Sequence, residues 1–177
     1  MNSKVRLATV WLDGCSGCHM SMLDMDERLL EIADKIELVH SPICDLKEFP
    51  ANVDVVIIEG AVTTAEDLHK ALTARKNSKL VIALGDCAVT SNVPAMRNYF
   101  DVDAVYERAF IENSTMNPQV PVQVVPALLE RTRPLHEFIK VDVYVPGCPP
   151  SADTIYTAIS ELLAGRIPDT TNISGFG

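Results

Sequence analysis

The sequence predicts an α/β fold, with one domain built on a parallel sheet that carries helices on both faces. Three observations lead to this prediction. Short apolar runs alternate along the chain with stretches of helical periodicity. Several of these runs are apolar throughout, which is typical of strands buried on both faces. The chain has 177 residues, and a single domain commonly has roughly 100–200. Together these features indicate a doubly wound, flavodoxin-like sheet.

Five short runs rich in Val, Ile or Leu are expected to form the strands of this sheet. Two of them, residues 55–58 and 80–84, contain no polar residue at all. In chain order, the expected strands are Val5–Leu12, Glu37–His40, Asp54–Ile58, Leu80–Leu84 and Val141–Val145.

Helices are expected between the strands. Met20–Ile36 places its apolar residues at a spacing close to 3.6, which predicts one helix. Thr64 and Asp67 have the spacing of a capping box, which predicts a helix over residues 64–76.

The second half of the chain is less regular. Residues 90–138 contain five prolines and are expected to form short helices and loops. Ser151 is positioned to cap a last helix, which Gly165 ends. Residues 166–177 are expected to be a tail, so that a single domain spans residues 1–177.

Charge and composition restrict the partners and the compartment. The 15 Lys and Arg against 24 Asp and Glu give a net charge of −9, which argues against nucleic acid and against anionic membrane surfaces as partners. No apolar run approaches the ~20 residues of a membrane span, and no leader peptide is expected after Met1. A cytoplasmic location is therefore expected, where five cysteines are not a disulfide framework.

Four of the cysteines follow the ends of three predicted strands. Cys15 and Cys18 come after the first strand, Cys87 after the strand 80–84, and Cys148 after the strand 141–145, in the pattern C-x2-C-x68-C-x60-C. Because ligands of such sheets bind beyond the carboxyl ends of the strands, these thiols are expected to meet at one edge.

Glycines accompany the cysteines in each loop. We expect Gly14, Gly17 and Gly147 to let the backbone approach a bulky ligand. Four thiolates suit either an iron–sulfur cluster or zinc. Spacing favours a cubane cluster, because structural zinc usually uses two short Cys-x-x-Cys pairs and this chain has one. Separate redox cysteines and inert buried thiols are the remaining alternatives.

The motifs CSGC at residues 15–18, GDCA at 85–88 and GCPP at 147–150 resemble those of the small subunit of nickel–iron hydrogenases. The related cluster subunit of complex I has adjacent cysteines in its first motif, whereas two residues separate Cys15 from Cys18. The string CSGCHMS followed by Leu23-Asp24 is most similar to the small subunit of soluble, NAD-reducing hydrogenases. The resemblance covers about residues 5–165.

This resemblance implies that Cys15, Cys18, Cys87 and Cys148 hold one [4Fe-4S] cluster. It implies an obligate large subunit that carries the nickel–iron site, and diaphorase subunits that carry FMN, NAD and further clusters. The chain would relay electrons between them while the whole complex catalyses H2 + NAD+ = H+ + NADH. The chain alone is expected to be non-catalytic, since its single Cys-x-x-Cys is used and no GxGxxG turn is present.

The chain departs from relatives in the family. Exported hydrogenase small subunits have a leader and a C-terminal domain with two more clusters, and neither is expected here. Asp86 stands where a small residue is usual before the third cysteine.

Other residues leave alternatives open. Cys44 is expected to be a free buried thiol rather than a ligand. His19 could donate to a cluster sulfur, lie at a subunit interface, pack in the interior or be exposed. Glu59 could join an interface network or be solvated. The segment Met20–Met25 and the loops around Cys87 and Cys148 are the expected contact surface, while His40, His69 and His136 show no metal pattern.

Two further functions compete with electron transfer. A stand-alone Cys-x-x-Cys thiol–disulfide oxidoreductase would leave Cys87 and Cys148 unexplained. An FMN-binding flavodoxin-like protein would need a phosphate loop after the first strand, where two cysteines stand instead.

Overall fold

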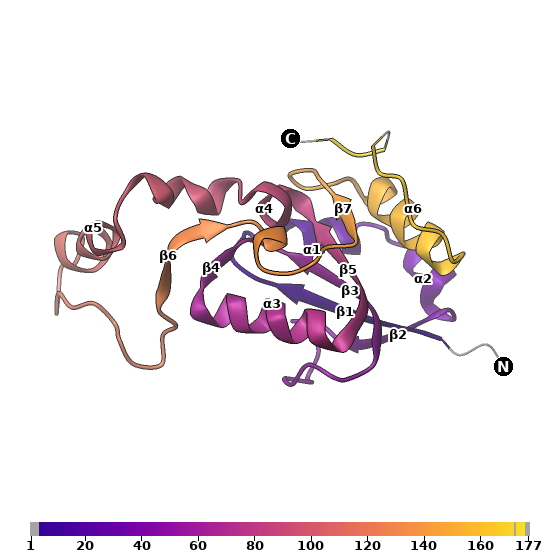
Figure 1. Ribbon diagram of the computed structural model, residues 1–177, viewed down its shortest axis with the longest axis horizontal. Coiled ribbons are helices and arrows are strands. Elements are labelled where there is room, and N and C mark those ends of the chain that lie inside the picture. The colour runs from indigo at the N-terminus through magenta and orange to yellow at the C-terminus, as the bar shows by residue number, and fades with distance from the viewer. Residues whose placement is uncertain (1–3, 172, 176–177) are drawn as a thin grey trace.

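A five-stranded parallel sheet forms the centre of the computed structural model, which describes residues 4–171 and 173–175. Its strand order is β2-β1-β3-β5-β7, which is the flavodoxin-like order. Figure 1 shows the strands side by side with helices in front and behind. The predicted α/β fold class is confirmed. The strands are β1 (Val5–Trp11), β2 (Ile36–His40), β3 (Val53–Glu59), β5 (Ser78–Leu84) and β7 (Val143–Val145).

The central strands are buried on both faces, which explains their unbroken apolar runs. In β3, Val56 and Ile58 belong to one hydrophobic cluster, which α3 (Ala65–Asn77) and α4 (Gly85–Thr90) complete through alanines. Val55 and Ile57 point into the second cluster on the opposite face, completed by α2 (Arg28–Ala33) and α6 (Ala152–Leu163). The sheet is therefore doubly wound.

The prediction of a single helix over Met20–Ile36 is wrong. The structure has two short helices there, α1 (Gly17–Leu23) and α2, and Ile36 already belongs to β2. Asp26 between them has a φ of 49°, a conformation that short polar residues tolerate better than most. The break turns Met25 into the core, where it is 4% exposed. The apolar spacing continues across both helices and therefore matches the pattern of a single helix.

Helix caps agree with the sequence. Asp67 donates its backbone N–H to the Thr64 hydroxyl at 3.1 Å and accepts the backbone N–H of Thr64 at 2.9 Å. Ser151 accepts the backbone N–H of Thr154 at 3.2 Å and opens α6. Both interactions satisfy donors that a helix leaves unpaired at its start.

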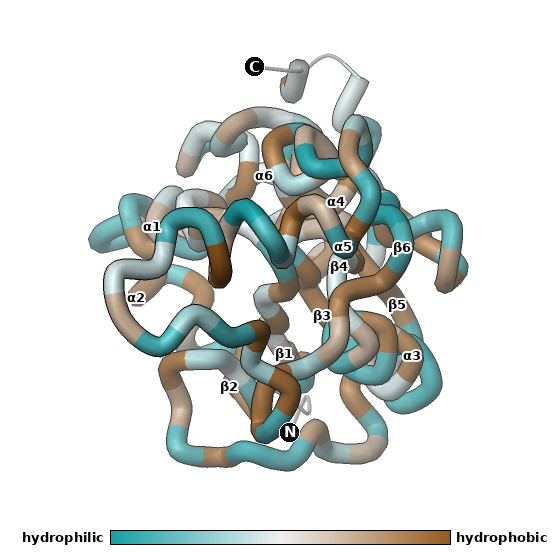
Figure 2. The backbone as a smooth tube through the Cα atoms, turned by 90° about the vertical axis from the view of Figure 1, so that its left-hand side faces the viewer, coloured by the Kyte–Doolittle hydropathy of each residue, from teal (hydrophilic) through white to brown (hydrophobic). Residues whose placement is uncertain are grey.

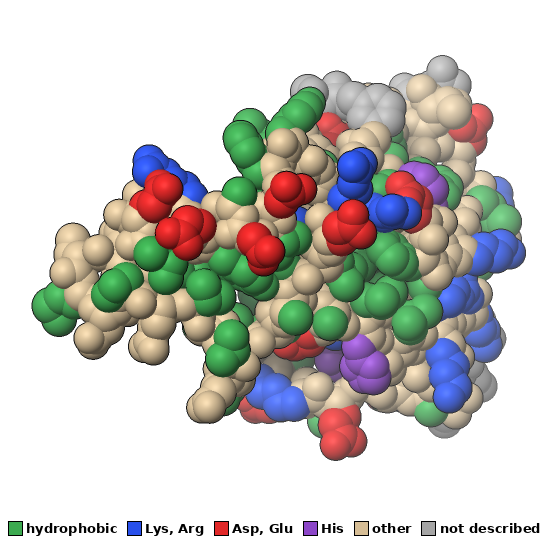
Figure 3. Space-filling view, turned by 60° about the vertical axis from the view of Figure 1, so that its left-hand side comes forward, with side chains coloured by type: hydrophobic (Ala, Val, Ile, Leu, Met, Phe, Trp, Pro, Cys, Tyr) green, Lys and Arg blue, Asp and Glu red, His purple; other side chains and the backbone are tan. Residues whose placement is uncertain are grey.

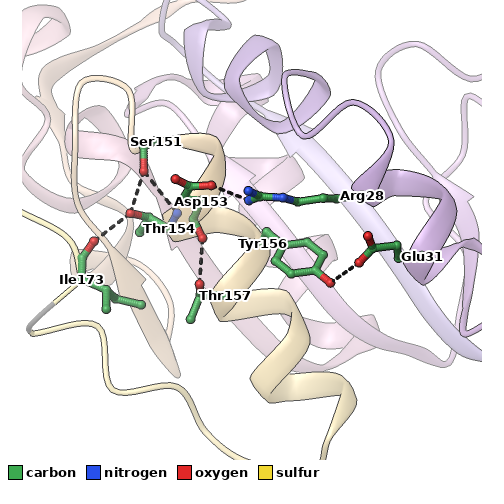
Figure 4. A network of polar contacts seen from close by, with 8 residues as sticks. All are labelled: Arg28, Glu31, Ser151, Asp153, Thr154, Tyr156, Thr157 and Ile173. Atoms are coloured by element: carbon green, nitrogen blue, oxygen red, sulfur yellow. Dashed lines mark hydrogen bonds and ion pairs between the residues drawn. The ribbon is translucent and has the colours of Figure 1, made fainter.

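Helices α2 and α6 are joined by two polar contacts on their exposed sides (Figure 4). Arg28 forms an ion pair with Asp153, and the Tyr156 hydroxyl donates to Glu31 at 2.6 Å. These contacts link the helix that comes soon after the first cysteine pair to the helix that follows Cys148.

Residues 90–138 contain more structure than their prolines suggested. The segments are η1 (Val93–Tyr99), α5 (Val102–Tyr106), a wider π-type turn η2 (Glu107–Glu112), β6 (Leu128–Arg133) and η3 (Leu135–Glu137). Strand β6 pairs antiparallel with β4 (Val62–Thr64), and neither strand was predicted. Figure 1 shows α5 and the following loop standing away from the sheet as an arm.

The end of the chain follows α6 without a helix or strand in residues 166–171 and 173–175. It nevertheless contacts the body, because Thr170 donates its hydroxyl to the carbonyl of Tyr144 at 2.6 Å. The tail expected over 166–177 includes Asn172, Phe176 and Gly177, and the expectation about a leader concerns Met1; all four lie outside the described residues. Within the described part, no helix is long and apolar enough to cross a bilayer.

Candidate metal centre

The four predicted cysteines all lie at the carboxyl edge of the parallel sheet. Cys15 and Cys18 follow β1, Cys87 lies in the first turn of α4 after β5, and Cys148 follows β7. Parallel strands deliver their following loops to the same edge, so the topology alone brings three distant segments together. Figure 2 views the molecule from that edge, with the arm that contains α5 nearest the viewer.

Electrostatic coupling indicates that the four thiols lie near one another. Burial raises the pKa of Cys18 to about 12, and Glu59 and the other three thiols act in the same direction. Burial likewise raises the pKa of Cys87 to about 11, and electrostatic interaction with Cys148 and Cys15 acts in the same direction. Ionisation of Cys18 and Cys87 is thus unfavourable in the bare protein. A bound cationic centre reverses this effect, because a coordinating thiol loses its proton outright.

The site is partly open to the surface. Cys15 and Cys148 are exposed, whereas Cys18 and Cys87 are half-buried, and all four are free thiols. Asn92 donates its side-chain amide to the sulfur of Cys148 at 3.5 Å, and the backbone N–H of Val93 donates to Cys87. Hydrogen bonds to sulfur are one of the means by which proteins tune cluster potentials.

Two of the glycines near the thiols, Gly17 and Gly85, make room for a sulfur atom. A Cβ on Gly17 would lie 3.1 Å from the sulfur of Cys15, and Gly147 has a φ of +140°. Gly14 packs against the backbone of Gly60 rather than against a thiol. The tightest position, Gly85, was not among the predicted site glycines: its Cβ would lie 2.2 Å from the Cys18 sulfur. Only the tertiary approach of two loops reveals this contact.

Glu59 and His19 form a buried pair beside the first cysteine loop. Glu59 is 2% exposed and accepts the backbone N–H of His19 at 2.7 Å. The His19 ring lies edge-on to Trp11, and its Nδ1 lies 2.8 Å from the same Glu59 oxygen, off the line of a hydrogen bond. A solvated Glu59 and an exposed His19 are therefore excluded. Glu59 is the last residue of β3, the one central strand that is not followed by any of the four cysteines.

Two further contacts connect the cysteine segments to one another. Ser21 in α1 donates its hydroxyl to the carbonyl of Pro150 at 2.5 Å. Asp86 accepts the backbone N–H of Gly147 at 2.6 Å and donates its own backbone N–H to the carbonyl of Gly147 at 2.9 Å. Sequence patterns give no sign of either contact.

Cys44 lies apart from the other four cysteines. It lines a cavity of about 500 Å³ together with His40 and His69, and it is absent from the groups that shift the pKa of Cys18 or Cys87. Among residues 4–171 and 173–175, no three His, Cys, Asp or Glu side chains stand close enough to hold a single metal ion.

Fold and site together define a class: flavodoxin-like α/β proteins that present four cysteines from three strands at one sheet edge. Residues 15–162 match the family model described as NADH ubiquinone oxidoreductase, 20 Kd subunit. The chain belongs to this family.

The chain is similar to subunits of several hydrogenases. The chain is 36% identical to the delta subunit of the NAD-reducing hydrogenase HoxS of Cupriavidus necator, over 96% of this chain and 85% of that one. It is 41% identical to a subunit of the F420-non-reducing hydrogenase of Methanothermobacter thermautotrophicus, over 96% of this chain but 58% of that one. The chain thus spans little more than half of such longer relatives.

A solved structure gives the same result. The chain aligns with a crystal structure of an NAD+-reducing [NiFe]-hydrogenase in the H2-reduced state at a TM-score of 0.93 and 36% identity, covering 99% of this chain and 100% of that one. The predicted resemblance to the small subunit of NAD-reducing hydrogenases, and the prediction of an oxidoreductase subunit, are confirmed.

Proposed function

We propose that this chain is the electron-transfer small subunit of a cytoplasmic, NAD-reducing nickel–iron hydrogenase. Cys15, Cys18, Cys87 and Cys148 would hold one [4Fe-4S] cluster, which passes single electrons when bound. The complex would couple H2 and NAD+ to H+ and NADH. The nickel–iron site would belong to a large subunit, and FMN and NAD to diaphorase subunits. The observation that carries the proposal is the coupling of four thiols at one sheet edge.

The residues around the thiols suit this task. Burial and the neighbouring thiols disfavour ionisation of Cys18 and Cys87, so these two sulfurs favour a cationic occupant. Gly85 and Gly17 leave room beside two of the sulfurs. Asn92 and the backbone of Val93 direct donors at two others. This chain would therefore hold the cluster, exclude part of the solvent and set its hydrogen bonds.

The same observations weaken the alternative of a thiol–disulfide oxidoreductase. A catalytic Cys-x-x-Cys needs a thiolate, which such proteins obtain by lowering a cysteine pKa. Here burial raises the pKa of Cys18 to about 12. Cys18 is a poor nucleophile without a metal, and the two additional thiols would have no task.

Partner subunits are expected to cover the apolar surface that begins at the site. Val93 donates to Cys87 and is itself exposed, and the neighbouring η1 exposes Met96 and Tyr99. Figure 3 shows apolar side chains on this side of the molecule together with acidic side chains along the arm. Exposed apolar patches of this kind mark protein interfaces. In the expected segment Met20–Met25, Met20 is 58% exposed, but Met25 is a core residue.

Purification with the co-eluting chains tests the proposal. Anaerobically prepared protein should contain about four iron and four sulfide per copy of this chain, as one cubane cluster requires, and should co-elute with a nickel-containing subunit. Hydrogen-dependent NAD+ reduction should require the complex. Stoichiometric zinc without iron would disprove the cluster. Hydrogen uptake that proceeds with another acceptor but never with NAD+ would disprove the diaphorase partnership.

A further inference from the structure

The carboxyl end of the short strand β7 is held by two hydrogen bonds to Asp86, one of them to its buried side chain. Paired residues in the β5–β7 ladder end at Leu84 and Val145, so Cys87 and Cys148 both lie beyond the ladder. Two hydrogen bonds continue the connection past this point. Asp86 Oδ1 accepts the Gly147 N–H at 2.6 Å, and the Asp86 N–H donates to the Gly147 carbonyl at 2.9 Å.

Each residue of this contact directly precedes one of the proposed ligands. Asp86 is followed by Cys87 and Gly147 by Cys148. Asp86 is 4% exposed, so its bond to Gly147 is shielded from water. Gly147 has a φ of +140°, and its loop has left the strand, so β-ladder pairing does not hold it. The side chain of Asp86 supplies the acceptor that the ladder no longer offers.

We infer that Asp86 is a positioning residue, whose carboxylate sets the separation of Cys87 and Cys148 so that both reach the same cluster. The inference rests on the proposed function, because it assigns a purpose to the spacing of two proposed ligands. Without the acceptor, the buried Gly147 N–H would lack a partner. Only the backbone bond from the Asp86 N–H to the Gly147 carbonyl would then remain, and the loop would relax toward solvent and carry Cys148 with it.

The chain offers a matched control at the opposite end of the same strand. Asp142 precedes β7 and accepts the backbone N–H of Val81 in β5 at 2.9 Å, together with Arg75 at 2.6 Å. This carboxylate also joins β5 to β7 and is mostly buried, but no cysteine adjoins it. Loss of Asp142 should therefore weaken the fold without changing the separation of the thiols.

A conservative variant separates the hydrogen bond from the charge. Asp86→Asn keeps an oxygen that can accept the Gly147 N–H and removes the negative charge. Asp86→Ala removes both. Positioning requires only the acceptor, so Asp86→Asn should behave like the wild type in ligand geometry, although its cluster potential can shift.

The experiment compares these variants in the complex produced with its partner subunits under anaerobic conditions. Iron and acid-labile sulfide per chain and the EPR spectrum of the reduced cluster are measured. Asp86→Ala should lose most of its iron or show an altered spectrum. Asp86→Asn should keep full iron and the wild-type spectrum. Asp142→Ala should keep both while unfolding at lower urea concentration.

Full iron with a wild-type spectrum in Asp86→Ala would overturn the inference, as would equal loss of iron in Asp86→Asn. If Asp86→Ala does not fold, amide hydrogen exchange of the cluster-free wild type and of Asp86→Asn decides. The Gly147 N–H should be protected in both, and exchange at the rate of an open loop would refute its bond to Asp86. Because this measurement needs no cluster, it remains decisive if the wild-type chain proves to hold no iron.

Discussion

Gly85 is the position at which a single methyl group should remove the cluster with little damage to the fold. An added Cβ would lie 2.2 Å from the sulfur of Cys18, and real Cβ atoms essentially never approach a heavy atom within 3.0 Å. The other neighbour, the carbonyl of Gly147, would be at 3.4 Å, an ordinary contact. In Gly85→Ala the clash therefore falls on a proposed ligand.

The structure gives the size of this effect. For an ordinary contact the sulfur must retreat by about 1 Å, several times the ~0.2 Å within which metal–ligand distances are maintained. The backbone contributes separately, since Gly85 has a φ of +82° and a left-handed residue with a Cβ costs about 1–2 kcal/mol. Stability should fall by that amount, or slightly more, while iron binding fails.

Gly165→Ala is the control for the backbone cost. Gly165 has a φ of +76°, close to that of Gly85, but a Cβ there meets no heavy atom within 4 Å. Both variants should lose similar stability in urea unfolding of the cluster-free chain. Only Gly85→Ala should lack iron and acid-labile sulfide after anaerobic preparation. Full iron in Gly85→Ala, or equal loss in Gly165→Ala, would refute the steric reasoning.

Three other predictions follow from the same site. Cys44→Ser should keep full iron, because Cys44 lies apart from the four electrostatically coupled thiols. Cys87→Ser and Cys148→Ser should lose or distort the cluster. Equal iron loss in Cys44→Ser would show that the proposed ligand set is wrong. The folded, cluster-free chain raises the pKa of Cys18 to about 12 and that of Cys87 to about 11. The folded thiols keep protons that unfolded thiols release above about pH 9, so stability should be full below that pH and fall as pH rises further. Urea midpoints measured between about pH 8 and pH 11 test this, and a flat profile would contradict it. Ser151→Ala should cost about 1 kcal/mol through loss of the α6 cap, with iron content unchanged; loss of iron would mean that the cap also positions Cys148.

The sequence alone determined the fold class and the place of the thiols. Unbroken apolar runs such as 55–58 predict strands covered on both faces, and their alternation with helices predicts parallel pairing. Once the strands are parallel, residues that follow them must share an edge. Cys87 and Cys148 could therefore be placed beside Cys15 without any contact being known. The helix caps at Thr64 and Ser151 are likewise local, because cap and partner lie three residues apart.

Sequence periodicity gave a wrong prediction where one long helix and two short helices share the same apolar spacing. The apolar spacing of Met20–Ile36 continues across α1 and α2, so only the backbone at Asp26 reveals the break. Strands β4 and β6 escaped prediction because β4 has three residues and β6 carries charged ones. Their pairing is a tertiary contact, and no pattern within either strand requires it.

Only the tertiary structure decided which groups surround the thiols. Gly85 meets Cys18, and Asp86 meets Gly147, 61 residues away. Asn92 reaches Cys148, and Glu59 reaches the backbone of His19. Side-chain identity and spacing carry information about burial and local turns. Contacts such as these depend instead on the register and packing of segments far apart in the chain, which a single sequence does not encode at any fixed spacing.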